Sequence, residues 1–307
     1  MYDLAIIGGG PAGVAAGVYA SRKQLKTIFI AHEIGGQSTV SSDVQNWIGT
    51  PSVTGVDLAK MLKEHLETYA GNCVEIKEGY KADIIEKDGD GFKITTDKGD
   101  KYTAKTVLIA SGAHRRKLKV PGAEEYDQKG LTYCASCDGP LFADKDVVVI
   151  GGGNAGFETA AQLLAYTKTV TMLHRSDLFR ADPVTVEKVL ANPKMKAIKN
   201  AETLEVKGDK MVTAIVYKDK NTDETRELAV QGIFVEIGLV PTTGYIKDLV
   251  ELDEYSRVVV DARTQQTSIP GIWAAGDCTN ELYHQNNIAA GDAVKAIEDI
   301  YNHLHAR

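Results

Sequence analysis

Short apolar runs that end at glycine recur along this chain, and each is followed by residues with helical spacing. The run from Asp3 to Gly8 precedes the small residues from Val14 to Arg22, and Thr27 to Ala31 forms the next apolar run. A strand, a tight turn, a helix and a second strand within about thirty residues are typical of a parallel crossover unit. Apolar residues between Asp57 and Tyr69 recur at helical spacing, which predicts a further helix.

The periodicity shifts toward two between Val74 and Ala110. Glycine and aspartate cluster at 88–91 and 97–100, where they indicate turns between short strands. This pattern predicts a small antiparallel meander over 74–110. The stretch ends in a buried-strand pattern from Val107 to Gly112.

The same order of elements then occurs a second time. The second set contains strands at 146–150 and 169–173, a helix at 157–166, meander strands at 211–218 and 226–230, and a closing strand at 233–238. This repetition indicates an internal duplication of a nucleotide-binding unit. The final segments, Ile272 to Asp277 and a helix near 287–304, have no counterpart in the second set if they belong to the first.

The second unit is therefore predicted to be inserted into the first. The expected fold class is α/β, with two three-layer Rossmann-like domains. A discontinuous domain would contain residues 1–115 and 243–307, and the inserted domain residues 116–242. The connectors are expected near 113–120 and 240–245, which contain proline or glycine.

Composition indicates in which compartment the protein works and which classes of partner it does not bind. The length of 307 residues suits two domains, and a formal charge of −7 argues against nucleic acid as a partner. No apolar run reaches the roughly 18 residues of a membrane-spanning helix, and the N-terminus has no leader pattern, so we expect no membrane partner. Four cysteines are too few for a secreted disulfide scaffold, which favours a reducing cytoplasm.

Two glycine loops predict two dinucleotide sites. One such loop alone can be an ordinary tight turn, but each loop here follows an apolar strand and precedes a helix. Backbone N–H groups and the positive helix end can then face a pyrophosphate. The expected cofactor contacts are Gly8, Gly10, Pro11, Ala12 and Gly13 in the first loop, and Gly151, Gly153, Asn154, Ala155 and Gly156 in the second.

The residues about twenty positions after each loop indicate which nucleotide binds. Glu33 stands there in the first unit, either as a ribose contact or as a solvated loop acid. The second unit has His174, Arg175 and Arg180, where arginines can bind a 2′-phosphate. This favours NADPH over NADH, although both arginines could be surface residues and Asp177 could weaken the preference.

Cys134 and Cys137 are separated by two residues and precede the second loop. Such a pair can form a disulfide that opens with two electrons, the amount that a hydride carries. A structural zinc site needs four ligands and no second motif supplies them, so we expect no metal. Two inert buried cysteines are the remaining alternative. Asp138 is suited to transfer the proton that thiol exchange requires, although aspartate before glycine is also a common turn residue.

In this order and across nearly the whole chain, these motifs resemble the low-molecular-weight thioredoxin reductases. They are also similar to the flavoprotein part of the alkyl hydroperoxide reductase F subunit. The shared motifs are GGGPAG at 8–13, GGQ at 35–37, NW at 46–47, CxxCDG at 134–139, GGGNAG at 151–156 and AAGD at 274–277. The resemblance implies FAD in the discontinuous domain, NADPH in the inserted domain, and a homodimer.

The resemblance also implies individual roles. Cys137 would lie beside the flavin, Cys134 would attack the partner's disulfide, and Asp138 would be the acid and base. Further FAD contacts would come from Gly36, Gln37, Asn46, Gly276, Asp277 and Gln285. Electrons would pass from NADPH through FAD and the disulfide to a thioredoxin- or glutaredoxin-like protein, with one nucleotide domain rotating between steps.

Two departures from the family pattern leave alternatives open. Ser176 stands where thioredoxin reductases usually carry a second arginine, so NADH remains possible. The segments 137–142 and 232–238 are more similar to the hydroperoxide reductase flavoprotein, whose N-terminal thioredoxin-fold domain does not precede this sequence. The acceptor is therefore expected to be a separate protein. An NADH-using peroxiredoxin-system reductase, a dithiol or NAD(P)H oxidase, and a flavin-bearing redox sensor are the alternative functions.

Overall fold

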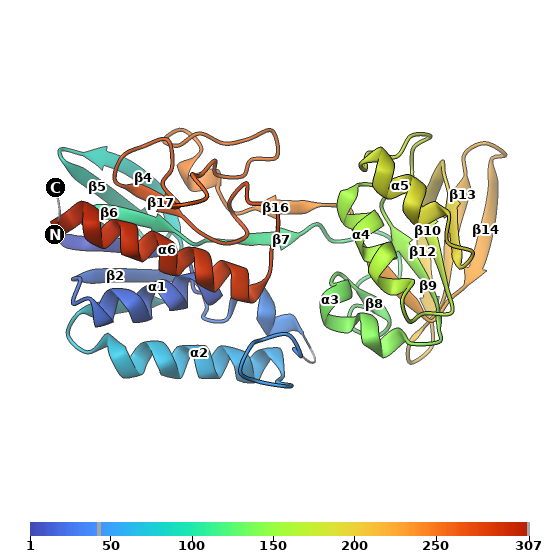
Figure 1. Ribbon diagram of the computed structural model, residues 1–307, viewed down its shortest axis with the longest axis horizontal. Helices are drawn as coiled ribbons and strands as arrows, with labels where there is room; N and C mark the ends of the chain where they lie inside the picture. The colour runs from blue at the N-terminus through green and yellow to red at the C-terminus, as the bar shows by residue number, and fades with distance from the viewer. Residues whose placement is uncertain (42–43, 306–307) are drawn as a thin grey trace. The chain divides into compact units, whose positions relative to one another are not determined.

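The computed structural model describes residues 1–41 and 44–305 and divides the chain into two units. The first unit contains Met1–His114 and the segment that begins at Val240, and the second contains Arg115–Leu239. The second unit is thus inserted into the first, as the order of the repeated elements predicts (Figure 1). The sequence places the boundaries at 116 and 242, and residues 306 and 307 of the expected first domain lie outside the described residues.

The two connecting segments form strands. Strand β7 (Ala113–Arg115) pairs with β16 (Leu239–Pro241) in a two-stranded sheet. The backbone N–H of Arg116 donates to the carbonyl of Gly238, and the N–H of Thr242 donates to that of Gly112, both at 2.9 Å. The chain therefore leaves the first unit and returns to it through one hydrogen-bonded pair of strands.

A seven-stranded sheet forms the middle layer of the first unit. Its order is β3-β2-β1-β6-β5-β4, with β17 beside β6. The strands are β1 (Tyr2–Ile7), β2 (Thr27–Ala31), β3 (Val74–Glu78), β4 (Ala82–Asp88), β5 (Gly91–Thr96), β6 (Lys101–Ile109) and β17 (Ile272–Ala274). Strands β3, β2, β1, β6 and β17 run parallel, whereas β4 and β5 form an antiparallel extension from β6.

The expected meander over 74–110 is wrong in one respect. Strand β3 pairs in parallel with β2, with Val74 opposite Thr27, so only β4, β5 and β6 make the antiparallel part. Strand β3 is an edge strand in which only Val74 is fully buried. Its mixed polar pattern therefore resembles that of a half-exposed antiparallel strand.

Helices cover one face of this sheet. They are α1 (Pro11–Arg22), α2 (Gly55–Ala70) and α6 (Asn286–His305), and α1 packs against both of the others (Figure 1). Their buried side chains form one core with Leu4, Phe29 and Trp273 of the sheet. On the opposite face, Ile246, Val250 and Val258 from the returning chain form a second core with the sheet. The first unit also contains two short 3-10 helices, η1 (Gly36–Val40) and η3 (Gly244–Ile246).

The second unit repeats this plan. Its parallel sheet has the order β11-β10-β9-β15-β8, made of β8 (Leu131–Thr132), β9 (Asp146–Ile150), β10 (Thr169–Leu173), β11 (Met195–Ile198) and β15 (Gly232–Val235). The helices α3 (Ala135–Asp138), α4 (Asn154–Leu163) and α5 (Pro183–Leu190) accompany it, with η2 (Gly139–Phe142) after α3. An antiparallel meander of β12 (Ala201–Gly208), β13 (Val212–Asp219) and β14 (Glu224–Ala229) contributes to the core of the other face.

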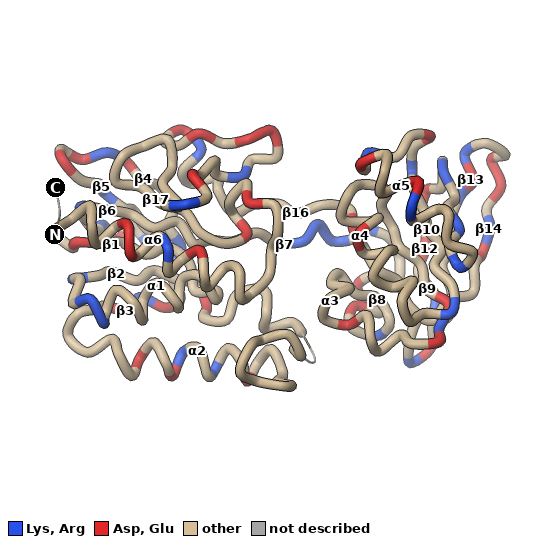
Figure 2. Tube along the Cα trace, in the orientation of Figure 1, with Lys and Arg blue, Asp and Glu red and all other residues tan. Residues whose placement is uncertain are grey.

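Acidic and basic residues are interspersed along both units (Figure 2). Within the described ranges, no helix is both long and apolar enough to cross a bilayer.

Candidate functional site

The first glycine loop joins β1 to α1 in a conformation that requires glycine. Gly8 has φ of +122°, and a Cβ on it would lie 2.1 Å from the Ala110 carbonyl oxygen. A Cβ on Gly13 would lie 1.9 Å from the Gly8 oxygen, so helix and loop meet without room for a side chain. A Cβ on Gly10, in contrast, would meet nothing within 4 Å. The loop therefore packs tightly on the protein and is open on its Gly10 side.

That open side faces a cavity of about 280 Å³ in the first unit. The cavity brings together the loop residues Gly8, Gly10, Pro11 and Ala12 with Glu33, Gly36, Gln37, Gly276 and Asp277, all expected from the sequence. Glu33 and Gln37 are exposed at its edge, and the N-terminus of α1 lies in the same wall. Because the first turn of a helix leaves backbone N–H groups without intrahelical partners, this wall is suited to an anion.

Asn46 and Gln285 lie beside each other but are not among the described residues that line the cavity. The Asn46 amide donates to the Gln285 side-chain oxygen at 3.2 Å. Asn287 donates to the Asn46 carbonyl at 2.7 Å and accepts from the Ile48 backbone N–H. These bonds attach the 46–48 segment to the start of α6, so the two predicted residues form one polar cluster.

The second glycine loop repeats the geometry of the first. Gly151 has φ of +125°, and its Cβ would lie 2.1 Å from the Glu236 carbonyl oxygen. A Cβ on Gly156 would lie 2.1 Å from the Gly151 oxygen, whereas one on Gly153 would meet nothing within 4 Å. Asn154 and Ala155 begin α4 directly behind this open side. The two loops are therefore equivalent positions of a duplicated fold.

The segment that carries the predicted phosphate contacts is attached to the second loop. Arg180 donates its backbone N–H to the Gly152 carbonyl at 2.9 Å, and Asp182 donates its own to the Asn154 side-chain oxygen at 2.8 Å. His174 is buried, and its Nε2 lies 2.8 Å from the Leu178 carbonyl. Because a carbonyl only accepts, Nε2 carries the proton in this bond. The buried His174 ring therefore forms a hydrogen bond within the segment 174–180 that carries both arginines.

Both arginines of this segment extend from the protein. Arg175 and Arg180 are exposed, and no described residue forms an ion pair with either guanidinium. A guanidinium without a protein partner is available for a phosphate or a carboxylate. This arrangement is compatible with the expected 2′-phosphate contact.

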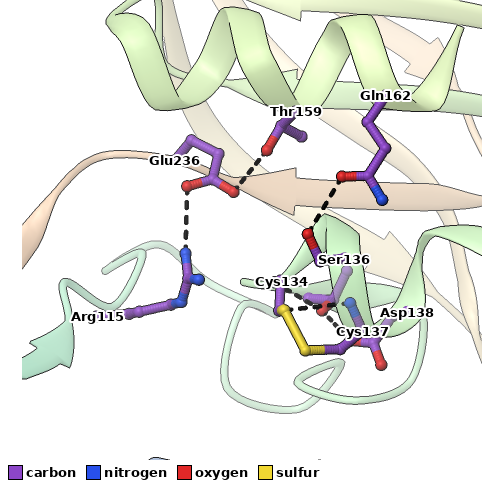
Figure 3. Close-up of polar contacts among 9 residues, drawn as sticks. Arg115, Cys134, Ser136, Cys137, Asp138, Thr159, Gln162 and Glu236 are labelled. Carbon is purple, nitrogen blue, oxygen red and sulfur yellow. Dashed lines mark hydrogen bonds and ion pairs between the residues drawn. A yellow bond between two sulfur atoms is a disulfide. The ribbon is translucent and has the colours of Figure 1, made fainter. Parts of the chain in front are cut away.

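Cys134 and Cys137 form a disulfide at the start of α3, with Cα atoms 5.3 Å apart (Figure 3). Cys134 is the N-cap of the helix, and its Sγ accepts the Cys137 backbone N–H at 3.2 Å. Both cysteines are partly exposed. Ser136, between them, donates to Gln162 of α4, whose amide donates to the Ala135 carbonyl. The pair is thus accessible while the short helix is fixed to the unit.

Asp138 is buried directly behind this disulfide, with 6% of its surface exposed. Its carboxylate accepts a hydrogen bond from the Thr132 hydroxyl, and its backbone N–H donates to the Cys134 carbonyl at 3.1 Å. No group of three or more potential metal ligands occurs among residues 1–41 and 44–305. The buried acid therefore directly follows the second cysteine of the disulfide (Figure 3).

A second buried carboxylate, Glu236, follows β15 beside the second loop. Arg115 forms an ion pair with it at 3.3 Å, and Thr159 of α4 donates to it at 2.9 Å (Figure 3). Burial raises the pKa of Glu236 above its ordinary value, and Arg115 and Thr159 oppose this rise. The sequence analysis did not identify this group, because one glutamate after an apolar strand has no distinguishing spacing.

The other two cysteines lie outside this constellation. Cys278 is fully buried, and burial raises the pKa of its thiol to about 11. It therefore remains a thiol at neutral pH and fits a structural position. Cys73 is partly buried and donates to the Gln24 side chain at 3.3 Å.

Comparison with known proteins identifies the family. Residues 2–296 match the model of the pyridine nucleotide-disulphide oxidoreductases. The chain belongs to this family. It is 41% identical over 304 residues to an alkyl hydroperoxide reductase F subunit of Pseudomonas aeruginosa and 38% identical over 303 residues to an NADH dehydrogenase of Bacillus subtilis. Each match covers 99% of this chain but 58% of the relative, so the chain spans a little over half of their length.

A solved thioredoxin reductase matches over its full length. The enzyme from Streptococcus pyogenes is 36% identical, with a TM-score of 0.90, and the match covers 100% of this chain and 99% of that one. The family resemblance that the motifs indicate is therefore confirmed, as are the two Rossmann-like domains. The cofactors of this family are FAD and NAD(P)H, as expected from the sequence.

The residues of the first cavity fit a dinucleotide. A Cβ on Gly10 would project into the cavity, where glycine leaves space for a pyrophosphate. Tyr245 also lines this cavity, and its buried hydroxyl has no hydrogen-bond partner in the described chain. A buried hydroxyl without a partner is costly, and a ligand with polar atoms would satisfy it. The sequence gives no signal for Tyr245, because it lies in the returning segment, far from both loops.

Proposed function

We propose that this protein is an NADPH-dependent reductase of a separate thioredoxin- or glutaredoxin-like protein. The observation that carries this proposal is the partly exposed Cys134–Cys137 disulfide beside the buried carboxyl group of Asp138. The full-length match to a thioredoxin reductase supports it. Disulfide exchange needs one accessible sulfur, one resolving sulfur and a proton donor, and these three groups lie within five residues of one another here.

The two glycine loops would divide the cofactors between them. The first loop, with Glu33 and Asp277, would hold FAD, and the second, with Arg175 and Arg180, would hold NADPH. Gln37, Asn46 and Gln285 would complete the FAD site. The buried His174 would position the segment that carries Arg175 and Arg180, through its hydrogen bond to the Leu178 carbonyl. Bound FAD accepts a hydride from a reduced nicotinamide and supplies two electrons to a disulfide.

The protein's own residues carry the remaining chemistry. Cys134 as thiolate attacks the partner's disulfide, forms a mixed disulfide and releases one partner thiolate. Cys137 then attacks Cys134, which restores their disulfide and releases the second partner thiolate. The overall reaction consumes one NADPH, one proton and one disulfide, and Asp138 transfers protons to the sulfur that leaves.

A second candidate is supported by the sequence comparison. The 41% identity to the alkyl hydroperoxide reductase F subunit favours a reductase that serves a hydroperoxide-reducing protein, and the 38% identity to an NADH dehydrogenase favours NADH as donor. This candidate differs from the first in the acceptor and the nicotinamide. Both use the same disulfide.

Steady-state rates with a panel of acceptors decide between them. The purified protein would be assayed with NADPH and NADH, each against thioredoxin, glutaredoxin, a peroxiredoxin with hydroperoxide, and oxygen alone. The proposal expects the highest kcat/KM with NADPH and a thioredoxin- or glutaredoxin-like protein. A higher value with NADH and the peroxiredoxin supports the second candidate. Fast turnover with oxygen alone would overturn both in favour of an oxidase.

We also propose a homodimer, on the resemblance to the thioredoxin reductase family. Light scattering after size-exclusion chromatography tests it. A mass near twice the chain's 33.2 kDa is expected, and a mass near that of one chain would contradict it.

A further inference from the structure

We propose that Thr132 is a positioning residue that orients the Asp138 carboxyl group for proton transfer at the disulfide. This inference rests on the proposed function, because it concerns the same sulfur exchange. Thr132 is the last residue of β8, two positions before Cys134, and only 3% of its surface is exposed. Neither the motif nor the family resemblance assigns it a role.

The direction of the Thr132 hydroxyl is determined by its two neighbours. The backbone N–H of Cys134 donates to the Thr132 oxygen at 3.2 Å. An N–H cannot accept, so the hydroxyl is the acceptor in this bond and its own hydrogen is available elsewhere. That hydrogen is donated to Oδ2 of Asp138. A continuous set of hydrogen bonds therefore connects the backbone of Cys134 to the carboxylate.

This connection has a chemical consequence. A donor to a carboxylate stabilises the ionised form relative to the protonated form. The bond also determines that Oδ2 of Asp138 accepts from Thr132, and it thereby fixes the direction of Oδ1. Because both residues are buried, the interaction is little screened by water. Thr132 thus sets both the orientation of Asp138 and the pH at which it takes up a proton.

A merely structural threonine offers a matched comparison in the same unit. Thr167 has 1% of its surface exposed, and its hydroxyl donates to the Leu163 carbonyl at 2.8 Å. It is as buried as Thr132 but bonds within the local helix end. Thr167→Val therefore removes a buried hydroxyl without changing the surroundings of Asp138.

The test compares pH profiles in Thr132→Val, Thr132→Ser and Thr167→Val. Two profiles are measured for each: kcat with a thioredoxin-like acceptor, and the rate at which iodoacetamide alkylates Cys134 and Cys137 after reduction by dithiothreitol. The second needs neither nicotinamide nor partner. Asp138→Asn, alone and combined with Thr132→Val, identifies the inflection that belongs to Asp138.

We expect Thr132→Val to move this inflection about one unit to higher pH in both profiles and to lower kcat about tenfold at pH 7. Thr132→Ser keeps the wild-type profile, and Thr167→Val changes neither inflection. In the Asp138→Asn background, Thr132→Val has no further effect on the profile. If Thr132→Val folds poorly, Thr132→Ala removes the same hydroxyl with a smaller side chain and is expected to give the same shift.

Two results would overturn the proposal. One is an unchanged inflection in the variants that lack the Thr132 hydroxyl. The other is an equal loss of kcat at every pH, in the presence and absence of Asp138, which a structural role produces. If the alkylation profile shifts as expected but no protein acceptor is reduced, the positioning role stands and the proposed function fails.

Discussion

The two glycine loops have nearly the same backbone and different surroundings. Gly8 and Gly151 have φ values of +122° and +125°, and each contacts the carbonyl of the residue after a parallel strand. That residue is Ala110 in the first unit and Glu236 in the second. The comparison teaches that the two loops keep one backbone geometry while the side chains around them differ.

The two units differ in the side chains that lie outside the glycine loops. After β2 the first unit has the single acid Glu33, whereas after β10 the second has Arg175 and Arg180, which pair with no acid of the described chain. Within the described residues, only the second unit contains a disulfide, which lies between β8 and β9. The residues proposed for nucleotide selection and for redox chemistry therefore lie outside the shared loop.

The largest effects are expected when Gly8 and Gly151, the equivalent glycines of the two loops, are replaced. Each substitution should impair the binding of only one cofactor. Gly8→Ala places a Cβ 2.1 Å from the Ala110 oxygen and should yield protein without FAD absorbance. Gly151→Ala produces the same clash with Glu236 and should keep the FAD while raising the KM for nicotinamide at least about 100-fold. Flavin content and steady-state kinetics measure these effects.

Gly291→Ala is the control, because this helical glycine has open space around it and the variant should retain both cofactors. If Gly8→Ala affected only the nicotinamide, or Gly151→Ala only the flavin, the assignment of the loops would be reversed.

Replacing the arginines should have an intermediate effect on the second site alone. Arg175→Gln and Arg180→Gln each remove a charge-assisted hydrogen bond to a 2′-phosphate, so the KM for NADPH should rise about tenfold. The KM for NADH should stay unchanged, because NADH lacks this phosphate. Arg226→Gln, at an exposed arginine that pairs with Glu224, should change neither value. Equal changes for both nucleotides would show that the arginines do not recognise the phosphate.

The sequence predicts most of this architecture, for identifiable reasons. The strands β2, β9 and β10 coincide with the predicted ranges, because each is a β-branched run whose residues are nearly all buried. Helix α5 and strand β11 were not predicted. Only Val189 of α5 is fully buried, and the short strand β11 is mostly half exposed, so neither has a strong hydrophobic pattern.

The residues of the site also fall into those that the sequence identifies and those that it does not. The glycine loops and the cysteine pair have fixed spacings that chemistry requires, so the sequence alone identifies them. Thr132 and Glu236 are distinguished by their burial and hydrogen bonds, and Tyr245 by its buried hydroxyl, none of which sequence spacing records. Their residue types are common in strands and loops, so only the folded structure distinguishes them.

Replacing Glu236, which occupies the position of Ala110 in the first unit, should give the smallest effect, and that effect is on the pH dependence of stability. Its raised pKa means that the folded protein binds this proton more tightly than the unfolded chain, so stability falls as pH rises above about 4.5, the ordinary value. Glu236→Gln should remove this fall, and because Arg115 is 34% exposed and keeps its hydration, the free energy of unfolding at pH 7 should change by about 1 kcal/mol or less.

Denaturant unfolding between pH 4 and pH 8 measures the effect, with the exposed Glu227→Gln as control. A steeper pH dependence in Glu236→Gln than in the wild type would contradict the role of burial.

The most direct test of the account counts thiols after reduction by nicotinamide. The protein would be treated anaerobically with excess NADPH, separated from the nucleotide, denatured, and titrated for thiols. Cys73 and Cys278 give two thiols per chain before reduction, and opening the Cys134–Cys137 disulfide raises the count to four. We predict four after NADPH in the wild type. A count that stays at two in protein that contains FAD would contradict the transfer of electrons to this disulfide.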